Sequence, residues 1–335
     1  MLKFTATPTQ QFYAKVTFQL LEKYPHLADV IGTGVDSWKI ALRNKFKNAR
    51  RKMTGDARIE ENRKRFAAKK RSSGPDDELR RKKGKMSTNT VFPFGEDETS
   101  LVAHETWLLA ESGKPLPNEK EMESRMALTA QRRIASIARM SVIDMKQKFP
   151  YLMDSRRFIK DFETLVKEEV RPKMSTGIDK IVELAMKKHV KCREDELRLL
   201  LEASEMDAGK LRTRHIQTVA VLQILAQNVR ECAAVRILFV QEGGNVPVTP
   251  CVQYNGPDLT YASNLLLHVD CEVLFSVSNA EEGIAALMAA HWLLNIEYPR
   301  KAFNILVAME WLLLGQRVTT PRMPVVKLLN TFKKS

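Results

Sequence analysis

The spacing of apolar residues predicts a short amphipathic helix near the N-terminus. Within residues 9–24, Phe12, Val16 and Leu20 recur at intervals of four, so they share one face of a helix. Pro25 is expected to end this helix, because the residue before a proline is disfavoured in the α region. The pattern favours a helical start to the chain.

A second amphipathic helix is expected over residues 37–53, with Asp36 or Ser37 as its N-cap. Its apolar stripe has intervals of three or four residues and comprises Trp38, Leu42, Phe46, Ala49 and Met53. At about 100° per residue, a row of cations falls on the flank beside this stripe and comprises Lys39, Arg43, Lys47 and Arg50. Such a helix can pack on a small core and present a positively charged row to a partner.

Residues 54–97 lack sustained hydrophobic periodicity and carry several blocks of lysine and arginine. Self-repulsion and sparse apolar content predict a disordered basic linker here. Two of the blocks flank Ser72–Pro75 in the form of a bipartite nuclear import signal, and they comprise Lys69, Lys70, Arg71, Arg80, Arg81, Lys82 and Lys83. The alternative is a linker that its charge merely keeps in solution.

Helical periodicity resumes near Glu98. In the last hundred residues, runs typical of strands also occur. Helices are expected over 98–111, 118–148, 154–171, 177–190, 194–205 and 212–230. Pro150 and Pro172 are expected to mark breaks between them. Strands are then expected over 234–241, 249–254, 264–269 and 271–277, followed by helices over 280–296 and 300–314.

These elements predict an α+β protein. We expect a helical N-terminal half with a disordered basic linker, and a C-terminal domain of helices with a small, mostly antiparallel sheet. The expected segments are a small helical basic module (1–53), the basic linker (54–97), a helical region (98–230) and an α+β domain (231–335). The apolar helix over 280–296 is expected to be buried in the core.

The net charge is concentrated in one segment. Residues 39–85 hold nineteen Lys and Arg against six Asp and Glu, a net of +13, while the whole chain carries +14. The polyanionic partner of this segment could be nucleic acid, an import receptor or an anionic membrane surface. Since cations at helical spacing can follow a phosphate backbone, we expect nucleic-acid contacts from Lys39, Arg43, Lys47, Arg50 and Arg51. The alternative is a solvated face on a structural helix.

No motif indicates an enzyme. The chain contains neither GxSxG nor GxxxxGK[ST]. His189 and Cys192 have an H-x2-C spacing, but no second pair lies at zinc-finger distance, so neither a metal nor another cofactor is expected. The four cysteines form no CxxC pair, and the longest apolar run is too short to span a bilayer. We therefore expect a soluble intracellular protein with reduced thiols and no membrane partner.

Several short runs resemble one group of vertebrate proteins. They are Tyr24–Leu27, Ser37–Lys39, Leu42–Met53, Met126–Arg133, Phe149–Leu152, Phe162 and Asn295–Pro299. Together they make the chain resemble the sterile-alpha-motif-domain-containing protein three-like family, a large group in fish, over most of its length. The sterile alpha motif itself needs more than the 23 residues that precede Tyr24, so that module is expected to be absent. The resemblance implies no catalytic residue and no settled activity.

We therefore expect a non-enzymatic nuclear protein that binds DNA or RNA mainly through residues 37–85, with an import receptor as a second partner. The alternative is a protein–protein adaptor whose C-terminal α+β domain binds a partner, with the basic linker serving only for nuclear import. A third possibility is a folded remnant of a mobile-element protein.

Overall fold

The computed structural model describes four stretches of the chain, which are residues 8–30, 32–52, 93–205 and 209–334. The side chains of residues 50–52 and 334 are not among those described. The predicted linker over 54–97 lies outside the described residues as far as position 92, and so do all seven residues of the predicted import signal.

The chain divides into two compact units. Unit 1 comprises Met1–Asp76 together with Pro321–Ser335, and unit 2 comprises Asp77–Thr320. This grouping places the helices after Glu98 and the sheet in the same unit, and it joins the last helix of the chain to the first two.

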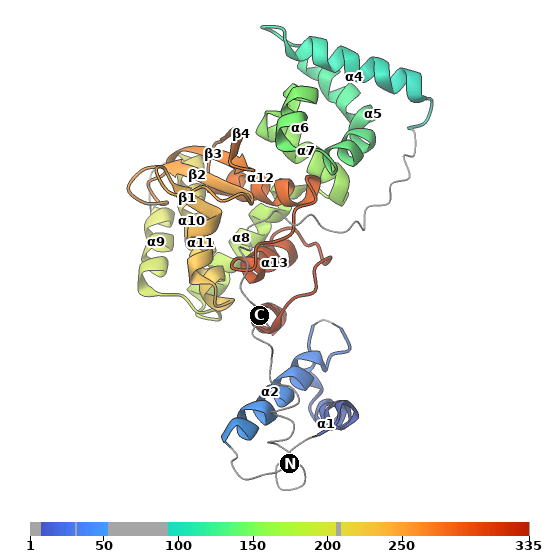
Figure 1. Cartoon of the computed structure of the whole chain (residues 1–335). Coiled ribbons are helices and arrows are strands. Elements are labelled where there is room, and N and C mark those ends of the chain that lie inside the picture. Colours follow the sequence, from blue (N-terminus) through green and yellow to red (C-terminus); the bar gives the residue numbers. More distant parts are fainter. Residues whose placement is uncertain (1–7, 31, 53–92, 206–208, 335) are drawn as a thin grey trace. The chain divides into compact units, whose positions relative to one another are not determined.

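Unit 1 consists of helices from the two ends of the chain (Figure 1), which are α1 (Gln10–Lys23), η1 (Pro25–Leu27), α2 (Asp36–Lys52) and α14 (Met323–Lys334). The buried rings of Tyr13 and Phe46 join α1 to α2 edge to face, with their centroids 5.6 Å apart. Trp38 is half-buried, and its indole Nε1–H donates to the carbonyl of Leu27 at 2.8 Å. The amphipathic pattern thus predicted both N-terminal helices to within two residues, whereas α14 was not predicted.

A backbone N–H group at the N-terminus of α2 is capped by a side chain that precedes the helix, that of Asp29. Sequence analysis assigned the cap to Asp36 or Ser37, but Asp36 is itself the first residue of the helix. Asp29 takes the capping role instead, because its carboxylate accepts from the Ser37 backbone N–H at 2.7 Å and from the Ser37 hydroxyl at 2.5 Å. The same carboxylate accepts from the Asn330 amide at 3.2 Å, which ties α14 to the start of α2.

Unit 2 is mainly helical, and its long helices precede and follow a small sheet. The helices before the sheet are α4 (Glu98–Ser112), α5 (Glu119–Ile137), α6 (Val142–Lys148), η2 (Pro150–Leu152), α7 (Ser155–Val166), α8 (Val170–Met186), α9 (Glu194–Glu205), α10 (Lys210–Asn228), η3 (Cys232–Ala234) and α11 (Val235–Leu238). Those after it are α12 (Ala280–Leu293) and α13 (Phe303–Leu312).

Three helix boundaries differ clearly from the sequence prediction, and one of them is the start of α8, which lies at Val170 and not at residue 177. The helix expected over 118–148 is divided into α5 and α6, with Ser141 capping α6 through a bond from the Asp144 N–H. The helix expected to end at Pro172 stops earlier, because Lys167 adopts a left-handed conformation (φ 57°) that closes α7. Pro172 then lies in the first turn of α8, where its missing N–H costs no intrahelical hydrogen bond.

The sheet has four strands in the order β1 (Phe239–Gln241), β2 (Cys251–Asn255), β3 (Ser263–Val269) and β4 (Glu272–Val277). β1 pairs with β2 in parallel, and the other two pairings are antiparallel. The predicted α+β fold with a small, mostly antiparallel sheet is confirmed. The strand expected over 234–241 is largely helical, since a short apolar run does not distinguish strand from helix by periodicity alone.

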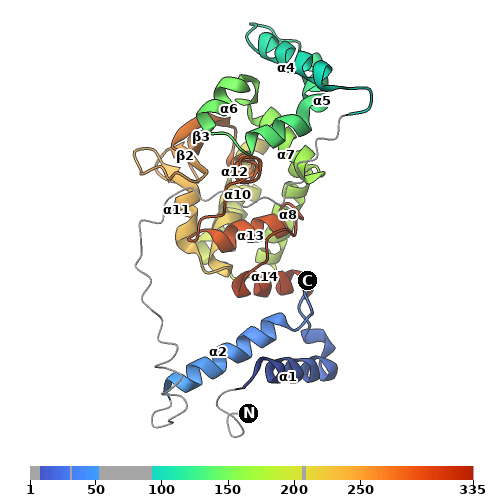
Figure 2. The same cartoon turned by 45° about the vertical axis from the view of Figure 1, so that its right-hand side comes forward.

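Helix α12 forms the centre of unit 2, with the sheet, α7 and α10 around it (Figure 2). It is buried on nearly every side, as its all-round hydrophobic composition predicted. Gly283 faces the sheet, where a Cβ at this position would meet a methyl group of Val252 in β2 at 3.4 Å, a van der Waals contact. Ring contact between Phe158 and Phe275, with centroids 5.3 Å apart, connects α7 to β4.

Candidate nucleic-acid interface

The lysines and arginines of α2 differ in their exposure and in whether a carboxylate lies near them. Arg43 and Lys47 are exposed, and neither has a carboxylate partner among the described residues. Lys39 is half-buried, lies 3.6 Å from a carboxylate oxygen of Asp36 and covers the ring of Phe18 at 5.4 Å. Arg50 and Arg51 belong to the same helix, although their side chains lie outside the described ones. The structure therefore places all five predicted contacts on one helix, with the side chains of Arg43 and Lys47 exposed.

Unit 1 has very few carboxylates to neutralise these cations. Its described stretches contain thirteen Lys and Arg but only Glu22, Asp29 and Asp36, which gives a net charge of +10. Asp29 is 7% exposed and turned toward Ser37 and Asn330. The backbone N–H of Thr33, assisted by Lys39, lowers the pKa of Asp36, so this carboxylate stays ionised and engaged within its own turn.

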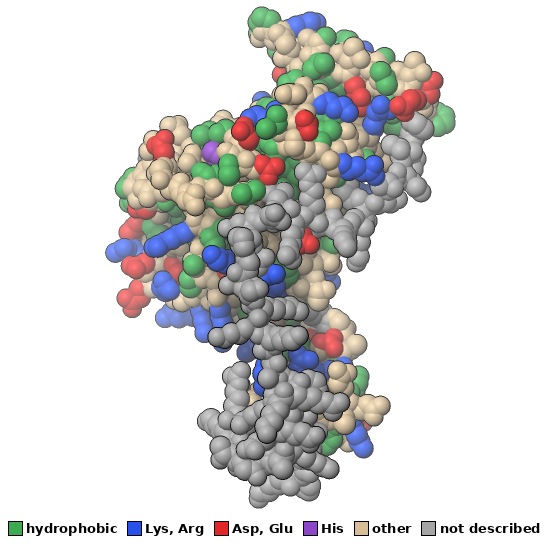
Figure 3. Space-filling view, in the orientation of Figure 1, with side chains coloured by type: hydrophobic (Ala, Val, Ile, Leu, Met, Phe, Trp, Pro, Cys, Tyr) green, Lys and Arg blue, Asp and Glu red, His purple; other side chains and the backbone are tan. Residues whose placement is uncertain are grey.

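Unit 2 has the opposite charge organisation. It contains 33 Lys and Arg against 33 Asp and Glu, so the whole net charge of +14 belongs to unit 1. Positive and negative side chains are interspersed on the face of unit 2 seen in Figure 3. Many of its arginines are paired, among them Arg125 with Glu121, Arg157 with Glu119, Arg171 with Glu282 and Arg214 with Glu281. A polyanion is therefore attracted to unit 1 far more than to unit 2.

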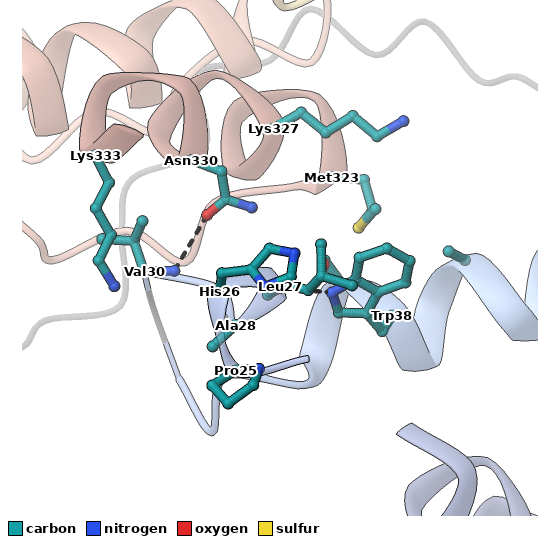
Figure 4. A pocket seen from close by; sticks show the side chains of 12 residues that line it. Pro25, His26, Leu27, Ala28, Val30, Trp38, Met323, Lys327, Asn330 and Lys333 are labelled. Carbon is teal, nitrogen blue, oxygen red and sulfur yellow. Dashed lines mark hydrogen bonds between the residues drawn. The ribbon is translucent and has the colours of Figure 1, made fainter. Parts of the chain in front are cut away.

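A pocket of about 430 Å³ opens in unit 1 between α2, the η1 turn and α14 (Figure 4). Leu27, Trp38, Ala41 and Met323 supply apolar surface, and no carboxylate is among the described residues that line the pocket. Lys327 and Lys333 of α14 lie at its rim, and neither has an ion-pair partner among the described residues. The pocket thus combines an aromatic wall with uncompensated positive charge.

Sequence analysis missed the contribution of α14 to this surface. Its signal was a short run of paired apolar residues, Val325–Val326 and Leu328–Leu329, which are all buried. The partners of α14 lie about 300 positions earlier, where the Val30 N–H donates to Asn330 Oδ1 at 3.1 Å. Local periodicity could have predicted the helix, but not the residues that it packs against.

Several buried ionisable groups of unit 2 have their hydrogen-bonding capacity taken up by the protein. Arg133 is fully buried and donates twice to Asp161, with both distances 2.6 Å. Glu310 is also fully buried and accepts from the backbone N–H groups of Val318 and Thr319. These arrangements are those of structural groups, which bind other elements of the fold.

The described residues contain no group of three or more His, Cys, Asp or Glu that could hold a metal ion. His189 is exposed, and burial raises the pKa of the half-buried Cys192 thiol. All four cysteines are free. In the part of the chain that the structure describes, no helix has both the length and the apolarity needed to cross a bilayer.

His215 introduces a pH dependence into unit 2. Its ring is 3% exposed, Nδ1 accepts from the Ala280 N–H at 3.1 Å, and Nε2 lies 2.8 Å from the Leu259 carbonyl. Nε2 therefore carries the proton of a neutral ring. Burial lowers the pKa of His215 below its ordinary value of 6.5, and burial also lowers the pKa of His268.

We expect the free energy of unfolding of unit 2 to fall as the pH drops below about 6.5, because the unfolded state then binds more protons than the folded state. Each histidine contributes a slope of up to about 1.4 kcal/mol per pH unit between its unfolded and folded pKa values, with full stability above that window. Urea unfolding of the full chain, followed by tryptophan fluorescence between pH 8 and 5, measures this slope. His215→Gln should reduce it, whereas replacement of the exposed His189 should not; an unchanged slope in His215→Gln would contradict the assignment.

Comparison with known proteins relates this chain to two curated sequences. Sterile alpha motif domain-containing protein 3 of mouse is 23% identical over 342 residues, which cover 96% of this chain and 62% of that protein. The human protein of the same name is 24% identical over 325 residues, which cover 96% of this chain and 61% of that protein. The chain thus spans about three fifths of the length of these relatives.

No family model matches the chain. No solved structure matches it either. The two relatives nevertheless align with 96% of it. The resemblance expected from the sequence is therefore confirmed, as a similarity to sterile alpha motif domain-containing protein 3 at 23–24% identity over 96% of this chain.

Proposed function

We propose that this protein is a non-enzymatic nucleic-acid-binding protein that acts in the nucleus and contacts phosphates through unit 1. The contacts are assigned to Lys39, Arg43, Lys47, Arg50 and Arg51 of α2. Import into the nucleus is assigned to the two basic blocks between Lys69 and Lys83. The names of the homologues give no activity that bears on this assignment.

The observation that supports the proposal is the uncompensated charge of unit 1. Its described stretches have a net charge of +10, whereas the net charge of unit 2 is zero. Cations without carboxylate partners can neutralise phosphates, and the counterions condensed on the nucleic acid are then released, which favours binding. Arg43 and Lys47 lie four residues apart on one face of α2, a spacing that lets both side chains reach one phosphate backbone.

We expect the double charge reversal Arg43→Glu with Lys47→Glu to weaken binding to all nucleic-acid sequences alike, because phosphate contacts do not distinguish bases. The slope of log affinity against log salt should decrease by roughly 0.7–0.9 for each lost contact. Fluorescence anisotropy with labelled oligonucleotides over a series of salt concentrations measures both effects in the full chain.

The matched control is Lys120→Glu with Lys191→Glu, which makes the same change of net charge at two exposed positions of unit 2. It should leave the salt slope close to that of the wild type. If the α2 variant and the control behave alike, the α2 cations form a solvated face, and the adaptor alternative is the better account.

A further inference from the structure

The lining of the unit 1 pocket includes two surfaces of different chemistry. One is the indole of Trp38, whose single polar atom, Nε1, already donates to Leu27 and is unavailable to a ligand. The other is the pair of lysines from α14, Lys327 and Lys333 (Figure 4). A group that fits here therefore joins a flat apolar body to an anion.

We propose that this pocket holds one unpaired nucleotide of a single-stranded nucleic acid, with its base against Trp38 and its flanking phosphates at Lys327 and Lys333. The inference rests on the proposed function and adds the class of nucleic acid to it. At about 1.5 Å of rise per residue, the two lysines are about 9 Å apart along α14, so they reach different phosphates of one strand. A base can enter such a pocket only when it is unstacked and unpaired, and single strands supply such bases where a duplex does not.

Charge and rigidity both favour this occupant. The described lining residues include Lys327 and Lys333 but no carboxylate, and the charge of the nearby Asp29 is engaged by the Ser37 hydroxyl and the Asn330 amide. The orientation of Trp38 is held by its bond to Leu27, and that of α14 by the two bonds that join Asn330 to Val30 and Asp29. An aromatic ring fixed before binding loses little entropy when a base stacks on it.

The pocket and the proposed phosphate row lie on opposite flanks of α2. By helical geometry, Ala41 and Trp38 share one flank, whereas Arg43 and Lys47 share the other. The exposed Lys45, one turn after Ala41, extends positive charge along the pocket side. The pocket can therefore be blocked without altering the row that the proposed function invokes.

The test uses Ala41→Met in the full chain, which places a longer side chain in the pocket from an exposed helical position. The control is Asn48→Met, at an exposed position of the same helix that does not line the pocket. The probes are a labelled single strand of mixed sequence, a duplex with the same number of phosphates, and a glutamate-rich peptide. Circular dichroism melting verifies that each variant is folded.

We expect the wild type to prefer the single strand to the duplex at equal salt. Ala41→Met should weaken single-strand binding by about tenfold, the loss of one stacked base, while duplex binding remains the same. Trp38→Leu should have the same selective effect, and Asn48→Met should have none. Binding of the single strand should also quench the fluorescence of Trp38, an effect that is absent in Trp38→Leu.

Three results overturn the inference. If both nucleic acids bind and Ala41→Met changes neither affinity, the pocket is not occupied by a base, while the proposed function stands. If Ala41→Met affects only the glutamate-rich peptide, the occupant is an acidic protein segment. If neither nucleic acid binds the wild type, the proposed function and the inference both fail.

Discussion

Replacement of Asp161 by leucine should destabilise unit 2 by about 3–5 kcal/mol, because it leaves the guanidinium of Arg133 buried without its counter-charge. Arg133 is fully buried and Asp161 is 2% exposed, and two bonds of 2.6 Å join them between α5 and α7. The remaining partners of Arg133 are neutral, namely the Thr129 hydroxyl at 2.6 Å and the Met126 carbonyl at 2.9 Å. They do not balance a charge that has lost both water and its carboxylate.

Urea unfolding monitored by tryptophan fluorescence measures this effect in unit 2, since Trp107, Trp292 and Trp311 all belong to that unit. The double variant Arg133→Met with Asp161→Leu removes both charges and should recover most of the lost stability. Arg198→Ala, which breaks a largely exposed pair with Asp195, should cost less than about 1 kcal/mol. A small loss in Asp161→Leu alone would show that the Arg133 site admits water or relaxes around the free charge.

Glu310→Ala should also be strongly destabilising, by about 3–5 kcal/mol, because it leaves several buried donors without an acceptor. One carboxylate oxygen of Glu310 accepts from the backbone N–H groups of Val318 at 2.9 Å and Thr319 at 2.6 Å. The other accepts from the Thr319 hydroxyl at 2.7 Å and the Tyr298 hydroxyl at 3.0 Å. The side chain thus fixes the segment that follows α13.

Hydrogen exchange tests the position of this effect as well as its size. In Glu310→Ala the amides of Val318 and Thr319 should exchange faster than in the wild type, beyond the change in global stability. Glu310→Gln keeps an acceptor for these amides and should have a smaller effect. Glu297→Ala, at an exposed position, should change stability by less than about 0.5 kcal/mol. Unaltered protection of Val318 and Thr319 in Glu310→Ala would mean that the segment has another anchor.

Local patterns predicted those parts of the fold whose determinants lie within one turn of helix or one strand. The stripe of α2, the range of α9 and the buried helix α12 follow directly from the spacing of apolar residues. The end of α7 was not predictable in this way. The left-handed residue that ends the helix is Lys167, whereas sequence patterns predict such an end from a glycine. At this end Glu163 accepts from the backbone N–H of Glu168 at 3.3 Å through its carbonyl and from that of Val170 at 3.0 Å through its carboxylate, and apolar periodicity does not report such bonds.

In the candidate interface, too, local spacing predicted some residues and could not predict others. Arg43 and Lys47 were predicted because helical spacing alone places them on one face. The pocket was not, because Lys327 and Lys333 come from a helix whose neighbours are about 300 residues away in the sequence. Asp29 shows the same dependence, since nothing near it in the sequence indicates that it caps α2 and binds Asn330.

The joining of α14 to the first two helices has a consequence for the order of folding during translation. The ribosome synthesises α1 and α2 well before α14, because the Asn330 side chain that bonds to Asp29 and Val30 lies about 300 positions later in the sequence. All of unit 2 lies between them and can fold in the interval. A nascent chain therefore carries an incomplete pocket until α14 has emerged, and a premature stop codon before Met323 would remove one wall of this pocket while sparing the residues of unit 2.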